Sequence, residues 1–107
     1  MILHLPDEVY DAFPQLQVFF EKLGLPVQQI QDRDLFLCAF VHKSYASDFK
    51  VVYDHNERLE FVGDAILGSV IAKALFLDFP QMQESTMTLY KIALVREETL
   101  CKVAKKI

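Results

Sequence analysis

The spacing of apolar residues constrains this chain most, because it is helical almost throughout. Only three glycines and four prolines interrupt the 107 residues. Between them, apolar side chains recur every three or four positions over residues 13–23, 34–46, 56–79 and 84–107, a period typical of amphipathic helices. No stretch alternates with a two-residue period long enough to predict a strand. We therefore expect an all-α fold, in which Gly24 ends the first of these helices.

The segment over residues 56–79 predicts the longest helix. Asp54 or Asn56 could cap its start, and Pro80 would end it. After Asp64 it is almost wholly apolar until Asp78, which favours a helix running through the interior. Its expected core stripe consists of Leu59, Val62, Ile66 and Val70.

Three carboxylates occupy a different face of the same segment. Glu57, Glu60 and Asp64 are spaced by three and four residues, so a helix places them in one row. Like charges in a row repel one another, and a hard cation such as Mg²⁺, which prefers carboxylate oxygens and water, would relieve that repulsion. A solvated acidic helix start is the alternative, but the helix dipole no longer favours an acid as far in as Asp64. From the spacing alone, a metal site and a solvated helix start both stay open.

Charge and composition narrow the classes of protein. The net charge of −4 argues against nucleic-acid binding by bulk positive charge alone. Acids dominate residues 1–64, whereas the balance turns basic after residue 90. No apolar run is long enough to cross a membrane, and the N-terminus lacks the pattern of a signal peptide, so we expect a cytoplasmic protein. Cys38 and Cys101 lie far apart among apolar neighbours, and we expect two buried, reduced thiols.

The acidic row lies in a run that resembles a known signature. Residues 56–65 read NERLEFVGDA, which resembles the NERLEFLGDA motif of the ribonuclease III family with one Leu-to-Val exchange. Upstream, residues 39–45 read AFVHKSY and resemble the family's AFTHKSY segment. Residues 84–100 resemble its EGxLSxLRxxLVSEETL stretch, with Met87-Thr88 and Arg96 as small departures. The similarity extends from about residue 16 to residue 107.

The resemblance implies roles for individual residues. Glu60 and Asp64 fall where the family places two of its four magnesium ligands, and both would be catalytic. Glu57 and Glu84 fall where acids line the active-site valley, and Phe61 falls where an aromatic ring enters a socket of the partner subunit in a homodimer. Lys91 and Arg96 could contact RNA phosphates, whereas Lys102, Lys105 and Lys106 are expected to be solubilising bases on an amphipathic helix. We expect no catalytic role for His42, which would hydrogen-bond near Lys43 and Ser44, or for His55.

The activity implied is magnesium-dependent hydrolysis of double-stranded RNA in RNA processing, including rRNA processing, with Mn²⁺ as a substitute metal. Residues 1–107 would form the N-terminal part of the nuclease domain. The family's other two ligands would come after Ile107, so the 107-residue chain alone is expected to be nearly inactive and to be a truncation or part of a longer protein. The alternatives are a non-catalytic dimerisation or RNA-binding scaffold of the same fold, and a helical protein with a structural metal site.

Overall fold

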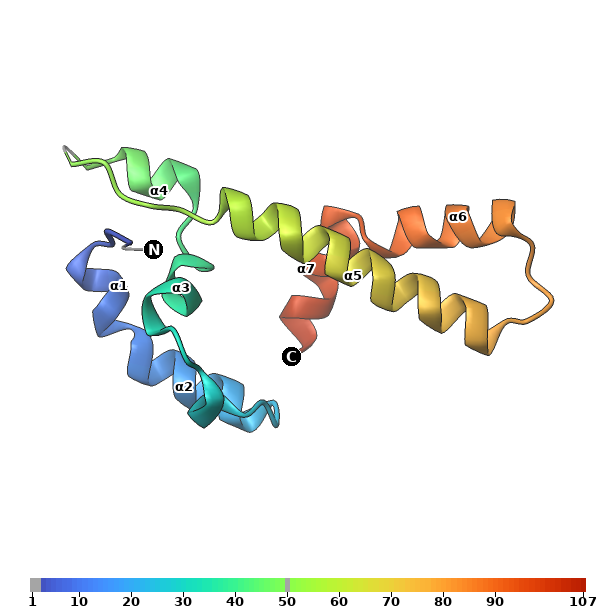
Figure 1. Ribbon diagram of the computed structural model, residues 1–107, viewed down its shortest axis with the longest axis horizontal. Helices are drawn as coiled ribbons and strands as arrows, with labels where there is room; N and C mark the ends of the chain where they lie inside the picture. Colours follow the sequence, from blue (N-terminus) through green and yellow to red (C-terminus); the bar gives the residue numbers. More distant parts are fainter. Residues whose placement is uncertain (1–2, 50) are drawn as a thin grey trace. The chain divides into compact units, whose positions relative to one another are not determined.

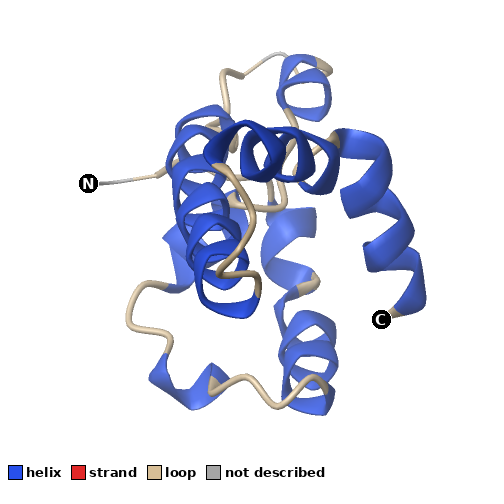
Figure 2. Ribbon diagram, turned by 90° about the vertical axis from the view of Figure 1, so that its right-hand side faces the viewer, coloured by secondary structure: helices blue, strands red, loops and turns tan. Residues whose placement is uncertain are grey.

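The computed structural model describes residues 3–49 and 51–107, and its regular elements there are all helical (Figures 1 and 2). The all-α prediction is confirmed. The helices, in chain order, are α1 (Asp7–Asp11), α2 (Phe13–Lys22), the short 3-10 helix η1 (Val27–Gln29), α3 (Arg33–Cys38), α4 (Lys43–Ser47), α5 (Glu57–Asp78), α6 (Glu84–Leu94) and α7 (Glu97–Lys106). No helix within the described ranges has the length and apolar character needed to cross a membrane.

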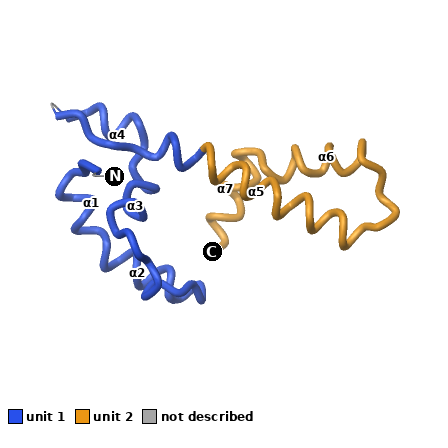
Figure 3. Tube along the Cα trace, viewed as in Figure 1, with its two compact units in different colours: residues 1–60 blue, residues 61–107 orange. Residues whose placement is uncertain are grey.

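The chain divides into two compact units, residues 1–60 and 61–107, and the division falls inside α5 (Figure 3). Unit 1 holds the helices from α1 to α4 and the first turn of α5. Its core consists of Leu5, Leu37, Cys38, Val41 and Ala46. Phenylalanine rings from α2 and α3 extend this core, and Phe20 meets Phe36 edge-on at a centroid distance of 5.6 Å.

Unit 2 consists of the rest of α5 with α6 and α7, and it buries very little. Gly68 and Leu75 are the buried residues of α5, while α6 and α7 contain none. Val62, Ile66 and Val70 are each more than half exposed, so the prediction that they form a core stripe is wrong. Leu59, the remaining member of that stripe, packs against the unit 1 core. Cys101 is exposed, which contradicts the prediction of two buried thiols, whereas Cys38 is buried as expected.

Two expected helices are broken into pairs. Within residues 34–46, the N–H groups of Phe40 and Val41 bond to carbonyls three residues back, and His42 is extended before α4 begins. Within residues 84–107, Arg96 is extended between α6 and α7. The Thr99 hydroxyl donates to the carbonyl of Ala93 across that break, at 2.7 Å. Side-chain and turn hydrogen bonds thus end helices where no glycine or proline stands.

The expected end of the first long helix is confirmed. Helix α2 finishes at Lys22, and Gly24 follows with φ of 79°. This left-handed conformation suits glycine, because other residues meet a steric penalty there. The unpredicted helix α1 begins immediately after Pro6, whose ring is compatible with a helix start.

Candidate active site

The loop before α5 is tied to the rest of unit 1 by hydrogen bonds to backbone groups. The Asn56 N–H donates to the carbonyl of Val41 at 2.8 Å, and the Asn56 side chain donates to the carbonyl of Ala39 at 3.0 Å. Asp54 accepts from the N–H of His4 at 2.6 Å. Both predicted cap residues therefore use their side chains to tie the preceding loop to unit 1 rather than to cap α5.

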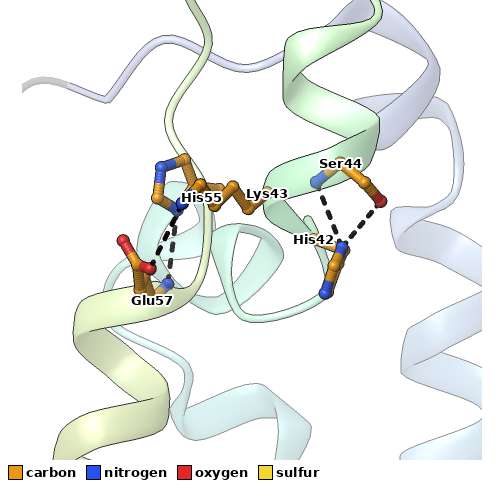
Figure 4. Close-up of polar contacts among 5 residues, drawn as sticks. All are labelled: His42, Lys43, Ser44, His55 and Glu57. Atoms are coloured by element: carbon orange, nitrogen blue, oxygen red, sulfur yellow. Dashed lines mark hydrogen bonds and ion pairs between the residues drawn. The ribbon is translucent and has the colours of Figure 1, made fainter.

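His55 and Lys43 both contact Glu57, the first residue of α5: His55 contacts its backbone N–H and Lys43 its carboxylate (Figure 4). His55 Nδ1 accepts from the N–H of Glu57 at 3.4 Å, and the His55 carbonyl accepts from the Cys38 thiol at 3.2 Å. Lys43 Nζ lies 3.9 Å from Glu57 Oε1, with both side chains largely exposed. An exposed pair at this distance contributes little to stability, so Glu57 remains free to exchange Lys43 for another cation.

Burial of Cys38 raises the pKa of its thiol, and the nearby Asp54 raises it further. The thiol therefore stays protonated and acts as the donor in its bond to the His55 carbonyl. This buried contact helps to hold the loop from which α5 begins.

The acidic stripe, which we define as Glu57, Glu60 and Asp64, lies along one face of α5. All three residues are exposed, and about 10 Å of helix axis separates the first from the last at the rise of an α-helix. Water reaches each carboxylate, so the stripe avoids the large cost of burying ionised acids. A row of exposed carboxylates is suited to binding a hydrated divalent cation.

The donor chemistry of the stripe fits magnesium, although the described residues supply only part of a cage. No group of three or more His, Cys, Asp or Glu side chains in the described ranges comes close enough to hold one ion. Magnesium usually keeps several waters and uses one or two protein carboxylates. Glu60 and Asp64, one turn apart, could provide such a pair.

Glu84 lies outside the helix that carries the stripe. It begins α6, and Lys91, farther along α6, lies against Gly68 of α5. Seven residues, about two helical turns, separate Glu84 from Lys91. Arg96 lies at the other end, as the N-cap residue of α7.

The His42 and His55 rings both make local hydrogen bonds. His42 Nδ1 lies 2.7 Å from Ser44 Oγ and accepts from the Ser44 N–H at 3.1 Å, so it caps α4. The predicted hydrogen bonding near Ser44 is confirmed. Sequence reasoning overlooked Gly68, which is buried beneath the Lys91 side chain. Its position four residues after Asp64, in the same row, is the signal that could have drawn attention to it.

Comparison with known proteins identifies the relatives of this chain. A family model described as Ribonuclease-III-like matches residues 32–107. Ribonuclease 3 of Natranaerobius thermophilus is 45% identical over 87 residues, which cover 81% of this chain and 36% of that protein. Ribonuclease 3 of Moorella thermoacetica is 42% identical over 93 residues, covering 87% and 38%. Ribonuclease 3 of Pseudomonas aeruginosa PAO1 is 47% identical over 75 residues, covering 70% and 30%.

The chain thus spans little more than a third of the length of the first two relatives. No solved structure matches it. The matched residues 32–107 contain the entire acidic stripe, Phe61 and the Gly68–Lys91 contact. On the family match and on these identities, the chain belongs to the ribonuclease III-like family.

Proposed function

We propose that residues 1–107 form the N-terminal part of a ribonuclease III nuclease domain that hydrolyses double-stranded RNA in a magnesium-dependent reaction. The observation that carries this proposal is the exposed acidic stripe on α5, within the segment that matches the family. RNA processing in the cytoplasm, including that of rRNA, is the proposed role.

Glu60 and Asp64 are the proposed metal ligands and catalytic residues. Their carboxylates are solvent-exposed and one helical turn apart, so they can bind a cation that retains water molecules. Bound magnesium or manganese would stabilise negative charge on the phosphate and lower the pKa of a coordinated water. Glu57 and Glu84 are proposed to line the same valley, where their charges would help to concentrate divalent cations.

Double-stranded RNA is the proposed substrate, and Lys91 and Arg96 are its proposed phosphate contacts. The deep, narrow major groove of an A-form duplex hides base edges from side chains, so recognition would depend on shape, phosphates and 2′-hydroxyls. Both bases are exposed and lie in unit 2 together with Asp64.

A homodimer is the proposed assembly, with Phe61 at its interface. Phe61 is 81% exposed, which supports an interface role more than a place in the core of its own chain. A large exposed aromatic ring directly beside the acidic stripe is well placed to enter a pocket of a second subunit.

The test is a chimera in which this chain replaces the matching 87 residues of the Natranaerobius thermophilus relative. We expect magnesium-dependent cleavage of a long RNA duplex, abolished by Asp64→Asn and reduced by Glu60→Gln, with partial rescue of the latter by manganese. Asp48→Asn, which removes an exposed acid outside α5, is the matched control and should cleave normally. Wild-type cleavage by Asp64→Asn would refute the proposal.

A non-catalytic scaffold is the second candidate, favoured by the absence of a three-ligand cluster among the described residues. The 107-residue chain alone should then self-associate or bind duplex RNA without cutting it. Little cleavage by the chain alone is expected under both proposals, so the chimera decides between them. A chimera that associates and binds RNA but never cleaves it would favour the scaffold.

A further inference from the structure

Gly68 is buried, because the end of the Lys91 side chain lies against it. A Cβ atom at position 68 would lie 3.2 Å from Lys91 Cε and 3.4 Å from Lys91 Nζ. At Gly63, on the same helix, a Cβ would meet nothing within 4 Å. The end of the Lys91 side chain therefore lies against α5 at a position where α5 carries no side chain.

This contact places a positive charge at the end of the acidic stripe. Gly68 follows Asp64 by four residues, so it lies on the same face of α5 and about 6 Å farther along the helix axis. Lys91 remains exposed overall, although its Cε and Nζ atoms lie against Gly68. It makes no ion pair within 4.0 Å among the residues that the structure describes. Its charge is thus not neutralised by a close carboxylate.

We infer that Gly68 and Lys91 form a phosphate-positioning pair, in which the Lys91 ammonium binds an RNA backbone phosphate beside Asp64 and Gly68 leaves the space on α5 in which the end of the lysine side chain lies. This inference rests on the proposed function and assigns one substrate contact within it. A phosphate approaching the stripe meets a row of negative charges, and like charges at such short range repel strongly. An ammonium with three donors at the end of that row provides the attraction that the carboxylates cannot.

The contact with Gly68 distinguishes Lys91 from the lysines of α7. Lys102, Lys105 and Lys106 lie in α7 and are exposed, like every other residue of that helix except the half-buried Thr99. A lysine whose end already contacts α5 loses less conformational freedom on binding than one that is free in solvent. Gly68 acts only through Lys91, because a Cβ at position 68 would have to displace the end of the Lys91 side chain by a few tenths of an ångström.

The pair is tested by measuring equilibrium binding of a fluorescent RNA duplex to the chain without divalent metal. Binding is measured at several potassium chloride concentrations, and the salt slope is the change in the logarithm of the binding constant with the logarithm of the salt concentration. Lys91→Met keeps most of the stem and removes the charge, so we expect weaker binding and a salt slope smaller by about one. Lys91→Arg should retain the slope. Lys102→Met removes the same charge from α7 and is the matched control, with little change expected. No measurable duplex binding, or equal effects of Lys91→Met and Lys102→Met, would overturn the inference.

The glycine is tested by Gly68→Ala against Gly63→Ala. Both changes favour the helix intrinsically, but only the first brings a Cβ against Lys91. We expect Gly68→Ala to reduce both affinity and salt slope to values between wild type and Lys91→Met, while Gly63→Ala changes neither. Thermal melting monitors folding, and a Gly68→Ala chain that melts normally and binds like wild type contradicts the role of Gly68.

The nuclease proposal and the Lys91 phosphate contact would be refuted by different results. A chimera that cleaves RNA with unchanged KM and salt dependence after Lys91→Met would refute the phosphate contact and leave the nuclease proposal intact. A chimera that never cleaves, but whose duplex binding depends on Lys91, would refute the nuclease proposal and leave the phosphate contact intact.

Discussion

The two units of this chain use similar apolar side chains in opposite ways. Unit 1 surrounds Leu37 and Val41 completely, and aromatic rings from α2 and α3 extend that core. Unit 2 exposes Phe76, Leu89 and Val103 by half or more. Apolar surface of this extent usually marks a contact with another molecule or segment. The difference teaches that helical periodicity identifies a helix but not the partner of its apolar face.

The largest expected effect tests whether stability resides in unit 1. Leu37→Ala removes a side chain that is 0% exposed, and such truncations cost about 2–5 kcal/mol in the free energy of unfolding. Leu89→Ala, in unit 2 and 68% exposed, should change it by about 0.5 kcal/mol or less. Urea denaturation followed by circular dichroism measures both. Equal losses would show that unit 2 has a core of comparable importance.

The next effect concerns self-association through unit 2. If Phe61 enters a socket of a second copy, Phe61→Ala should weaken the dimer by roughly 2 kcal/mol or more per site. Because Phe61 is 81% exposed, unfolding of the isolated chain should change little. Sedimentation equilibrium gives the monomer–dimer constant. Phe76→Ala removes another exposed ring of α5 and serves as the control. An equal effect of the two substitutions would argue for general apolar association instead of a defined socket.

The smallest effect concerns helix capping, which also differs between the units. Asp32 caps α3 by accepting from the Leu35 N–H at 2.9 Å, so Asp32→Ala should cost about 1 kcal/mol. Gln83 precedes α6 in an extended conformation and makes no side-chain cap bond. Gln83→Asp should therefore stabilise unit 2 by up to about 1 kcal/mol. Thermal melting would show a lower midpoint for the first variant and a higher one for the second. A lower midpoint for Gln83→Asp would show that this residue has another role.

The helical class, the long α5 and the turn at Gly24 could be predicted from the sequence, because each depends on local spacing or on one residue type. The break at His42 could not, since it depends on an imidazole that caps α4. The exposure of Ile66 and Val70 could not be predicted either, because burial depends on which helices pack together. Sequence spacing placed Glu57, Glu60 and Asp64 in one row, but Gly68 became informative only when Lys91 was found on it.

The unbroken path of α5 through the boundary between the units has an evolutionary consequence. Each residue added to an α-helix turns everything after it by about 100° around the axis. A single-codon insertion between Glu60 and Asp64 would therefore move Asp64 and Gly68 out of line with Glu60 while changing no side chain. Point substitutions can be tolerated one at a time along such a helix, whereas a change in its length alters every later position together. We therefore expect related genes to vary in length between helices, at residues 79–83 and 51–56, and to keep the number of residues from Glu57 to Gly68, where Lys91 contacts α5, constant.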